Sequence, residues 1–152
     1  MAYEFTVSGR IAKPVHEVFE AVADPKELSA YFTTGGAQGR LEKGATVTWD
    51  FADFPGAFPV HVVDVVPDQK IMLRWDAAPD DDAAGLYQTT VTMTFEALED
   101  GRTLVRIHEE GFRESEAGRK GAFGNCEGWT GMLCAMRVWK EHGIRFRDGF
   151  YK

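Results

Sequence analysis

The sequence contains no long hydrophobic run, because no apolar stretch of its 152 residues approaches the roughly 20 that a helix needs to cross a bilayer. Its first ten residues, MAYEFTVSGR, also lack the apolar stretch of a signal peptide. Basic residues are in the minority, with 17 Lys and Arg against 24 Asp and Glu and a net charge of -7. Nucleic acids and anionic membranes recruit basic surfaces, so we expect a cytoplasmic protein with no membrane span and no nucleic-acid partner.

Cysteine is scarce as well. Cys126 and Cys134 are the only two cysteines and fall in one apparent helix, where a rise of about 1.5 Å per residue separates them by about 12 Å. That separation is too large for a disulfide. We expect free thiols, as in a reducing compartment.

The common catalytic and cofactor-binding motifs are absent. The chain has no Gly-x-Ser-x-Gly, no His-Glu-x-x-His, no phosphate loop ending in Gly-Lys-Ser or Gly-Lys-Thr, and no Gly-x-Gly-x-x-Gly that opens a helix. The histidines show no metal-ligand spacing: His16, His61, His108 and His142. We expect no cofactor and no metal, and we interpret His108 as a surface residue.

The composition that is present suits a folded domain. A hydrophobic share of 44%, with 12% aromatic residues, is enough for a core. A chain of this length is also the size of one ordinary domain. We therefore expect a single domain over residues 1–152.

The first third of the chain predicts one strand and two short helices. Apolar and polar residues alternate from Tyr3 to Ile11, as in a half-buried strand. Apolar residues then recur at helical spacing over 15–22, after Pro14, which suits a first helical position. Asp24 and Pro25 end that helix and begin a second, shorter one.

The middle of the chain predicts an antiparallel meander, because the hydrophobic period falls to two and turn residues recur regularly. Six strands are expected, at 35–40, 45–51, 58–66, 71–75, 87–96 and 103–112. A loop at 52–57 and an acidic loop at 77–85 separate some of them.

The longest helix is expected at about 121–142, with Gly143 as its C-terminal cap. It has a wide apolar face: Cys126, Trp129, Met132, Leu133, Met136 and Trp139. A stripe of small residues flanks that face: Gly121, Gly124, Gly128, Gly131 and Ala135. Each interior glycine costs about 1 kcal/mol relative to alanine, so the geometry must require small residues there.

This order of elements predicts an α+β fold. A seven-stranded antiparallel sheet has one apolar face, and only the final helix is long enough to cover it, so the sheet should curl around that helix. A bent sheet and a single helix fill space imperfectly, which favours a cavity between them.

The chain resembles the START-like, or helix-grip, superfamily of SRPBCC proteins. Within it, the chain is most similar to bacterial proteins related to the C-terminal domain of the activator of heat-shock-protein-90 ATPase. The likeness rests on four motifs that span most of the chain: Lys13, Pro14, Val15, Val18 and Phe19; Asp24, Pro25, Leu28 and Tyr31; Glu109, Gly111 and Phe112; Gly128, Trp129 and Leu133. The resemblance implies the helix-grip fold and an ability to bind a small hydrophobic molecule.

Glu109 is the most informative ionisable residue. Val105 and Ile107 share its strand face, so the alternation that buries them should bury the carboxylate too. A buried carboxylate must be paired, hydrogen-bonded or protonated, and such groups often do acid-base work. Glu109, helped by Tyr87, is therefore the candidate catalytic residue, unless the strand has already reached solvent at that point.

Aromatic and aliphatic residues supply the candidate ligand-binding set. Beside Glu109 it comprises Trp49, Phe51, Trp75, Tyr87, Phe95, Trp129, Leu133 and Met136, with Trp49 and Trp129 as the leading candidates. Tyr87 adds a hydroxyl that can orient a polar end of a ligand. The alternative for every member is an ordinary place in the core.

Three functions remain open from the sequence. The first is a binding module for a small hydrophobic molecule, driven by apolar burial. The second is a cyclase or dehydratase that acts on a polyketide-like substrate, as in similar folds. The third is an interaction protein for a heat-shock-protein-90 chaperone, as the resembling family suggests. Exposed strand edges also favour a homodimer.

Overall fold

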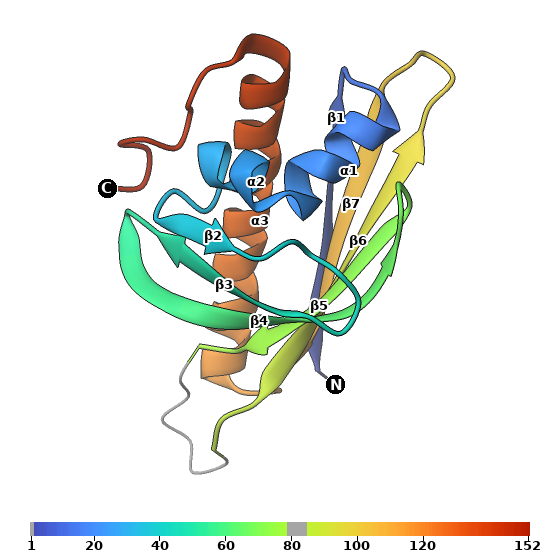
Figure 1. The fold of residues 1–152 in the computed structure, drawn as a ribbon. Coiled ribbons are helices and arrows are strands. Elements are labelled where there is room, and N and C mark those ends of the chain that lie inside the picture. The colour runs from blue at the N-terminus through green and yellow to red at the C-terminus, as the bar shows by residue number, and fades with distance from the viewer. Residues whose placement is uncertain (1, 79–84) are drawn as a thin grey trace.

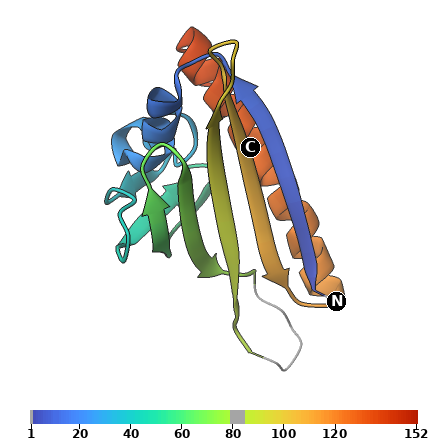
Figure 2. The same cartoon turned by 90° about the vertical axis from the view of Figure 1, so that its right-hand side faces the viewer.

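The computed structural model describes residues 2–78 and 85–152. In these residues, seven antiparallel strands form one sheet in the order β1-β7-β6-β5-β4-β3-β2, and three helices accompany it. The sheet bends around the long helix α3, whereas α1 and α2 cover one end of the concave face (Figures 1 and 2). The α+β helix-grip fold expected from the sequence is confirmed. The elements are β1 (Tyr3–Ile11), α1 (Val15–Ala23), α2 (Pro25–Tyr31), β2 (Gly36–Gln38), β3 (Thr46–Phe51), β4 (Phe54–Val66), β5 (Lys70–Asp76), β6 (Gln88–Ala97), β7 (Thr103–Phe112) and α3 (Glu116–His142).

The N-terminal elements follow the sequence pattern closely. In β1 half-buried and exposed positions alternate along the strand, as expected, and the strand ends at the buried Ile11. Asp24 ends α1 and also begins α2, where its carboxylate accepts a hydrogen bond from the Lys26 backbone N–H at 2.9 Å. Pro25 occupies the first turn of α2, where a missing N–H costs nothing. One residue thus separates two helices that run in different directions.

The strand β4 begins earlier than the sequence predicts. Residues 52–57 were expected to form a loop, but Phe54 already pairs with Phe51 across a connection made by Ala52 and Asp53. Pro55 and Gly56 are typical of loops, yet the first part of β4 pairs with β3 alone, because pairing with β5 starts only at His61. Proline is tolerated at such an edge position. The expectation of a loop at 54–57 is therefore wrong.

The sheet bends at irregularities in its ladders. The register shifts between Trp49 and Phe51 in the β3–β4 pair, and between Val62 and Asp64 in the β4–β5 pair. The first shift places two extra residues in β4 and the second places one there, and such irregularities increase the local twist. The bend brings β3 and β4 round toward α3, so side chains from both ends of the sheet face the same helix.

Helix α3 starts at Glu116, five residues before the expected start at Gly121. The Ser115 hydroxyl caps it by accepting a hydrogen bond from the Gly118 N–H at 3.0 Å. Gly118 in this first turn hid the helical pattern, because glycine is unfavourable in helix interiors. The C-terminal end was predicted correctly: Gly143 is the cap, with a left-handed φ of 67°.

The core lies between the concave face of the sheet and α3, which packs against β1 and β7. Fully buried side chains from both layers meet there: Ile71, Leu73, Met93, Ile107, Trp129, Met132 and Met136. Among the helices of the described residues, none is both long and apolar enough to cross a membrane. Of the expected acidic loop at 77–85, residues 79–84 lie outside the described part of the chain.

Candidate functional site

Glu109 lies inside the protein, as the strand alternation predicts, and its side chain is 0% exposed. In β7 it follows the buried residues Val105 and Ile107 on the same strand face. Its partner in the neighbouring strand β6 is Val91, which is also fully buried. The regular period of two along β7 is therefore what carries a carboxylate into the core.

Four side chains from three different elements donate hydrogen bonds to this carboxylate. Trp75 Nε1 in β5 and Thr89 Oγ1 in β6 donate to Oε2 at 2.8 and 2.6 Å. Trp129 Nε1 in α3 donates to Oε1 at 2.8 Å. Asn125 Nδ2, one helical turn before Trp129, lies 3.2 Å from Oε1 and 3.1 Å from Oε2. We call these five residues the Glu109 network.

The Glu109 network joins the sheet to α3 by polar contacts in the middle of an apolar core. Every donor in it is an uncharged group, and an indole N–H can only donate. Both carboxylate oxygens therefore act as acceptors, and each has at least two donors within hydrogen-bonding distance. Removing any one partner would leave a buried polar group without its hydrogen bond, which costs free energy. The network therefore holds both indole rings and the Asn125 amide in one orientation.

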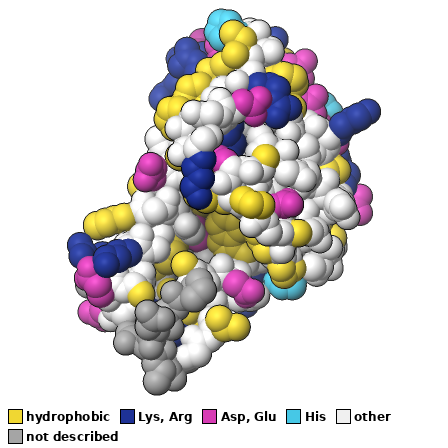
Figure 3. Space-filling model, turned by 90° about the vertical axis from the view of Figure 1, so that its left-hand side faces the viewer, with side chains coloured by type: hydrophobic (Ala, Val, Ile, Leu, Met, Phe, Trp, Pro, Cys, Tyr) yellow, Lys and Arg dark blue, Asp and Glu magenta, His cyan; other side chains and the backbone are white. Residues whose placement is uncertain are grey.

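A hollow of about 360 Å³, which we call the aromatic pocket, lies next to this network. Figure 3 shows the face of the molecule on which hydrophobic side chains form the floor of a depression. The walls come from the end of α2, from β3, β4 and β5, from the first half of α3 and from the segment after α3: Phe32, Phe51, Phe54, Trp75, Gly124, Asn125, Glu127, Gly128, Trp129, Arg147 and Tyr151.

Trp129 is at the centre of the ring contacts around the pocket. Its ring stacks on Phe32 at a centroid distance of 5.5 Å and lies 5.3 Å from the Trp75 ring. Phe32 in turn makes an edge contact with Phe51 at 5.0 Å. Such contacts hold aromatic walls in defined positions. Four of the lining rings thus form a continuous series of contacts, which includes the two indoles that Glu109 orients.

The glycine stripe of α3 has two different structural roles. At Gly124 and Gly128, a Cβ atom would meet nothing within 4 Å, so these two positions leave the pocket open. At Gly131, a Cβ atom would collide with the Tyr151 hydroxyl, and at Gly118, which precedes the stripe in α3, it would collide with the Arg113 carbonyl. The expectation that the geometry requires small residues is thus confirmed at Gly131, whereas Gly121, Gly124 and Gly128 have space for a Cβ atom.

The segment after α3 returns to cover one side of the pocket. Arg147 is only 8% exposed and makes a two-pronged ion pair with Asp53 at 3.0 and 3.1 Å. Its guanidinium lies 4.6 Å from the centroid of the Phe51 ring and 5.0 Å from that of Tyr151. Burial raises the pKa of the Tyr151 phenol above its ordinary value, so the hydroxyl stays protonated at neutral pH.

The structure separates the residues of the predicted ligand-binding set. Phe51, Trp75 and Trp129 line the aromatic pocket, and Glu109 lies behind the two indoles. The others do not line it: Trp49, Phe95, Leu133 and Met136 are buried in the core. Tyr87 lies apart from the pocket wall, where its hydroxyl accepts a hydrogen bond from the Arg113 backbone N–H and its ring packs under the Arg113 guanidinium at 4.2 Å.

Sequence reasoning missed six of the lining side chains. These are Phe32, Phe54, Asn125, Glu127, Arg147 and Tyr151. Asn125 had a signal, because it lies one turn before Trp129 on the flank of the apolar face of α3. Arg147 and Tyr151 follow the helix in a segment without periodicity, so no pattern in the sequence indicated their place.

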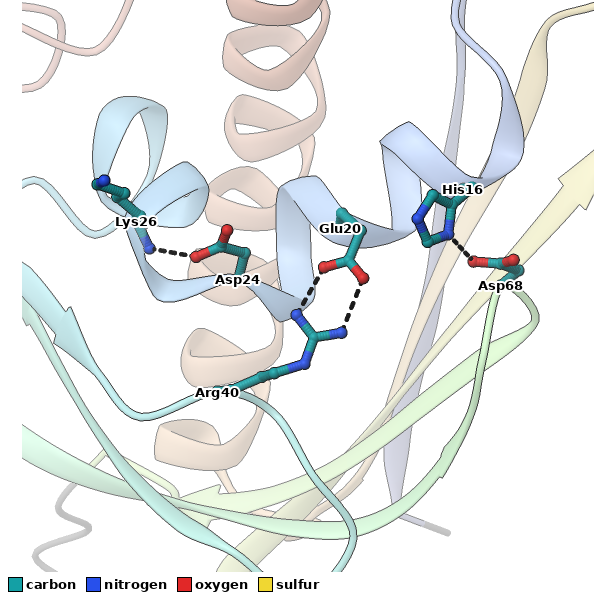
Figure 4. Close-up of polar contacts among 6 residues, drawn as sticks. All are labelled: His16, Glu20, Asp24, Lys26, Arg40 and Asp68. Carbon is teal, nitrogen blue, oxygen red and sulfur yellow. Dashed lines mark hydrogen bonds and ion pairs between the residues drawn. The ribbon is translucent and has the colours of Figure 1, made fainter.

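Two further hollows have a different character. One, of about 280 Å³, lies between α1, the chain after β2 and the β4–β5 turn, and it is bordered by ion pairs. There Arg40 makes a two-pronged contact with Glu20 at 2.6 and 2.8 Å, and His16 contacts Asp68 at 2.9 Å (Figure 4). The other, of about 480 Å³, lies along α3 and is lined by both free cysteines. No residue of the Glu109 network lines either hollow.

The outer face of β7 has its own polar cluster. His108 Nε2 lies 2.9 Å from a Glu110 oxygen and 3.8 Å from a Glu4 oxygen, and its Nδ1 contacts the Thr6 hydroxyl at 2.8 Å. Glu4 and Glu110 are directly opposite each other in the β1–β7 pair. All three ligand-type atoms lie within 4.8 Å of one another, although both carboxylates are exposed to solvent. We call this group the outer cluster, and its place at the surface agrees with the interpretation of His108.

Comparison with solved structures shows how widely this fold occurs. A protein from Staphylococcus saprophyticus is 26% identical, with a TM-score of 0.77 over 95% of this chain and 96% of that chain. DynU16, a putative protein in the dynemicin biosynthetic locus, is 22% identical, with a TM-score of 0.75 over 92% of this chain and 48% of that chain. The Aha1 dimer from Colwellia psychrerythraea is 15% identical, with a TM-score of 0.71 over 93% and 98%.

The family assignment rests on the sequence itself. A search of curated proteins finds no match. The family model described as "Activator of Hsp90 ATPase homolog 1-like protein" matches residues 12–138, which run from the end of β1 into the last part of α3. This match includes the three strands and the part of α3 that build the Glu109 network. The chain belongs to the family of activator of Hsp90 ATPase homolog 1-like proteins.

Proposed function

We propose that the protein binds a small, mainly hydrophobic molecule in the aromatic pocket. The observation that carries this proposal is the construction of the pocket, in which fixed aromatic rings surround a hollow where Gly124 and Gly128 place no side chain. The hollow of about 360 Å³ is within the range of small-molecule sites. A ligand gains about 25 cal/mol for each Å² of apolar surface that it removes from water there.

The proposal assigns Glu109 a positioning role. Its oxygens already accept hydrogen bonds from four protein side chains, and the pocket wall is formed by three of those donors rather than by the carboxylate. A general acid or base must reach the proton that it transfers. The alternative of a cyclase or dehydratase, with Glu109 and Tyr87 as its acid-base pair, therefore has less support than simple binding.

The second candidate is a contact with a chaperone. The family description and the Colwellia psychrerythraea Aha1 relative favour it. Addition of the purified protein to a heat-shock-protein-90 chaperone distinguishes the two ideas: under the leading proposal the ATPase rate does not change. Stimulation of that rate by wild type, and equally by a variant with a filled pocket, would favour the chaperone instead.

The leading proposal is tested by filling the pocket. We would titrate the protein with N-phenyl-1-naphthylamine, an uncharged probe that fluoresces when it leaves water. Gly128→Leu places an isobutyl group in the open space and should weaken binding at least about tenfold, because apolar contact area is lost.

The matched control is Thr130→Leu, which adds the same side chain to an exposed position of α3 outside the pocket. Its affinity should equal that of wild type. Equal affinities for all three proteins, or no binding by folded wild type, would show that the pocket is not the binding site.

A further inference from the structure

Asn125 is the one amide in the wall of the aromatic pocket, and its orientation is fixed. Its Nδ2 lies 3.2 and 3.1 Å from the two Glu109 oxygens. Oxygens that already accept from indole N–H groups require a donor at this position, so the NH₂ end of the amide must face the carboxylate. Oδ1 then points away from Glu109, and no hydrogen bond to it occurs within residues 2–78 and 85–152.

The two indoles are oriented by the same carboxylate. Trp75 and Trp129 both direct their N–H groups to Glu109 at 2.8 Å. What remains for the pocket is the carbon surface of the two rings. This wall therefore has aromatic faces and one acceptor, Asn125 Oδ1, because its three donor nitrogens are already hydrogen-bonded to Glu109.

We infer that the molecule bound in the aromatic pocket is a planar, uncharged aromatic compound with a hydroxyl group that donates a hydrogen bond to Asn125 Oδ1. This inference rests on the proposed function and narrows its ligand class. Planarity follows from the stacked walls, in which the Trp129 ring lies at 29° to Phe32 and at 30° to Trp75. The hydroxyl follows from Asn125 Oδ1, the acceptor beside the two indole rings; the other acceptor that lines the pocket, the Glu127 carboxylate, is exposed to solvent.

The charges near the pocket favour an uncharged ligand. Arg147 and Glu127 line the pocket with opposite charges, so the first would repel an ammonium group and the second would repel a carboxylate. A carboxylate has less to gain, because Nε and Nη2 of Arg147 are already bound to Asp53 and Asn125 presents only its oxygen. A hydroxyl group can donate to Asn125 Oδ1 without carrying a charge. Its transfer from water into the pocket therefore costs less free energy than the transfer of a charged donor.

Three naphthalene derivatives test the inference by calorimetric titration of the full chain. 2-Naphthol has the donor, 2-methoxynaphthalene has the same ring without it, and 2-naphthoate has a negative charge. A single hydrogen bond to an uncharged acceptor should make 2-naphthol bind about five- to tenfold more tightly than 2-methoxynaphthalene. 2-Naphthoate should bind more weakly than 2-naphthol.

The variant Asn125→Ala removes the acceptor and should bind 2-naphthol and 2-methoxynaphthalene equally. Thr130→Ala is the matched control, because its hydroxyl bonds to the Cys126 carbonyl within α3 and lies outside the pocket, and it should keep the full preference. Circular dichroism and thermal melting show whether each variant is folded. If Asn125→Ala does not fold, the order of the three ligands on wild type decides alone.

The outcomes separate this inference from the function on which it rests. Equal binding of 2-naphthol and 2-methoxynaphthalene to wild type would overturn the inference that the ligand has a hydroxyl group, while the proposal that the pocket binds a ligand would stand. A preference that survives in folded Asn125→Ala would overturn the role of this acceptor. Tightest binding of 2-naphthoate would overturn the uncharged class. Failure of all three ligands, together with N-phenyl-1-naphthylamine, would remove the proposed function itself.

Discussion

The two faces of β7 each carry a glutamate, but the two carboxylates are stabilised in different ways. Glu109 points into the core and is 0% exposed, whereas its neighbours His108 and Glu110 point outward, with side chains 32% and 54% exposed. The inner carboxylate contacts only uncharged donors from the sheet and α3. The outer carboxylate contacts an imidazole and faces another glutamate.

The difference shows what each environment requires of a carboxylate. Inside, water cannot replace a lost partner, so every donor must be supplied by the fold and held in place. Outside, water competes with every contact, so ion pairs contribute little to stability and tolerate rearrangement. The inner face of β7 therefore determines the geometry of the pocket wall, while the outer face chiefly determines the surface charge.

The largest expected effect comes from exchanging one carboxylate oxygen for an amide on each face. Glu109→Gln places an NH₂ group against donors that need an acceptor, and it should lower the free energy of unfolding by about 3 kcal/mol. Glu110→Gln should change it by no more than about 0.5 kcal/mol. Urea unfolding of both variants measures the difference, and similar values for the two would refute the contrast between the faces.

A single donor tests the inner face more finely. Thr89→Val removes the hydroxyl that donates to Glu109 at 2.6 Å and should lower the free energy of unfolding by about 1–2 kcal/mol. Thr92→Val makes the same change in β6 on the opposite face of the strand, beside His108, and should be nearly neutral. Thermal melting monitored by circular dichroism compares them. If Thr92→Val lowers the stability as much as Thr89→Val does, the effect comes from placing valine in β6 and not from the lost hydrogen bond to Glu109.

The outer face should respond in the opposite sense. Glu4 and Glu110 form a directly opposed pair of like charges, which is unfavourable across a strand pair. Glu4→Gln should therefore leave stability unchanged or raise it by about 0.3 kcal/mol at low salt, and added salt should remove the gain. Urea unfolding at two salt concentrations measures it. A clear loss of stability would show that the outer cluster is more than an ordinary surface ion pair.

The smallest expected effect concerns His16, an exposed histidine next to a carboxylate. Its hydrogen bond to Asp68, with the charge of that residue, raises the pKa of His16 above its ordinary value of 6.5. The protonated pair adds stability that is fully present below pH 6.5 and is lost as the pH rises through the folded-state pKa. Asp68→Asn should return the pKa toward 6.5, which an NMR titration of the imidazole measures. An unchanged pKa would mean that Asp68 is not the cause.

The fold was largely predictable because it depends on periodic patterns. The alternation in β1, β6 and β7 indicated correctly which residues are buried, and Gly143 marked the end of α3. The errors fell where local signals conflicted with tertiary pairing. Pro55 and Gly56 are typical of a loop but belong to β4, and the glycines at the start of α3 concealed its first turns.

The candidate site was only partly predictable. The burial of Glu109 followed from its strand face, but its partners come from β5, β6 and α3, and only the bend of the sheet brings these together. The choice of Trp49 as a lining residue had no such support, since in the structure it is 0% exposed and packs behind Phe32 and Trp75. Residues with the same periodicity can thus lie in the core or at a pocket, depending on contacts distant in the sequence.

The open positions at Gly124 and Gly128 allow the volume of the pocket to change without a change in the fold. Because a side chain there would extend into free space, single substitutions at either position can shorten or reshape the hollow without disturbing the Glu109 network or the sheet. Single mutations at these two positions can therefore adapt the pocket to smaller or differently shaped ligands. Each step would also gain helix propensity, so a smaller hollow and a more stable helix would come together.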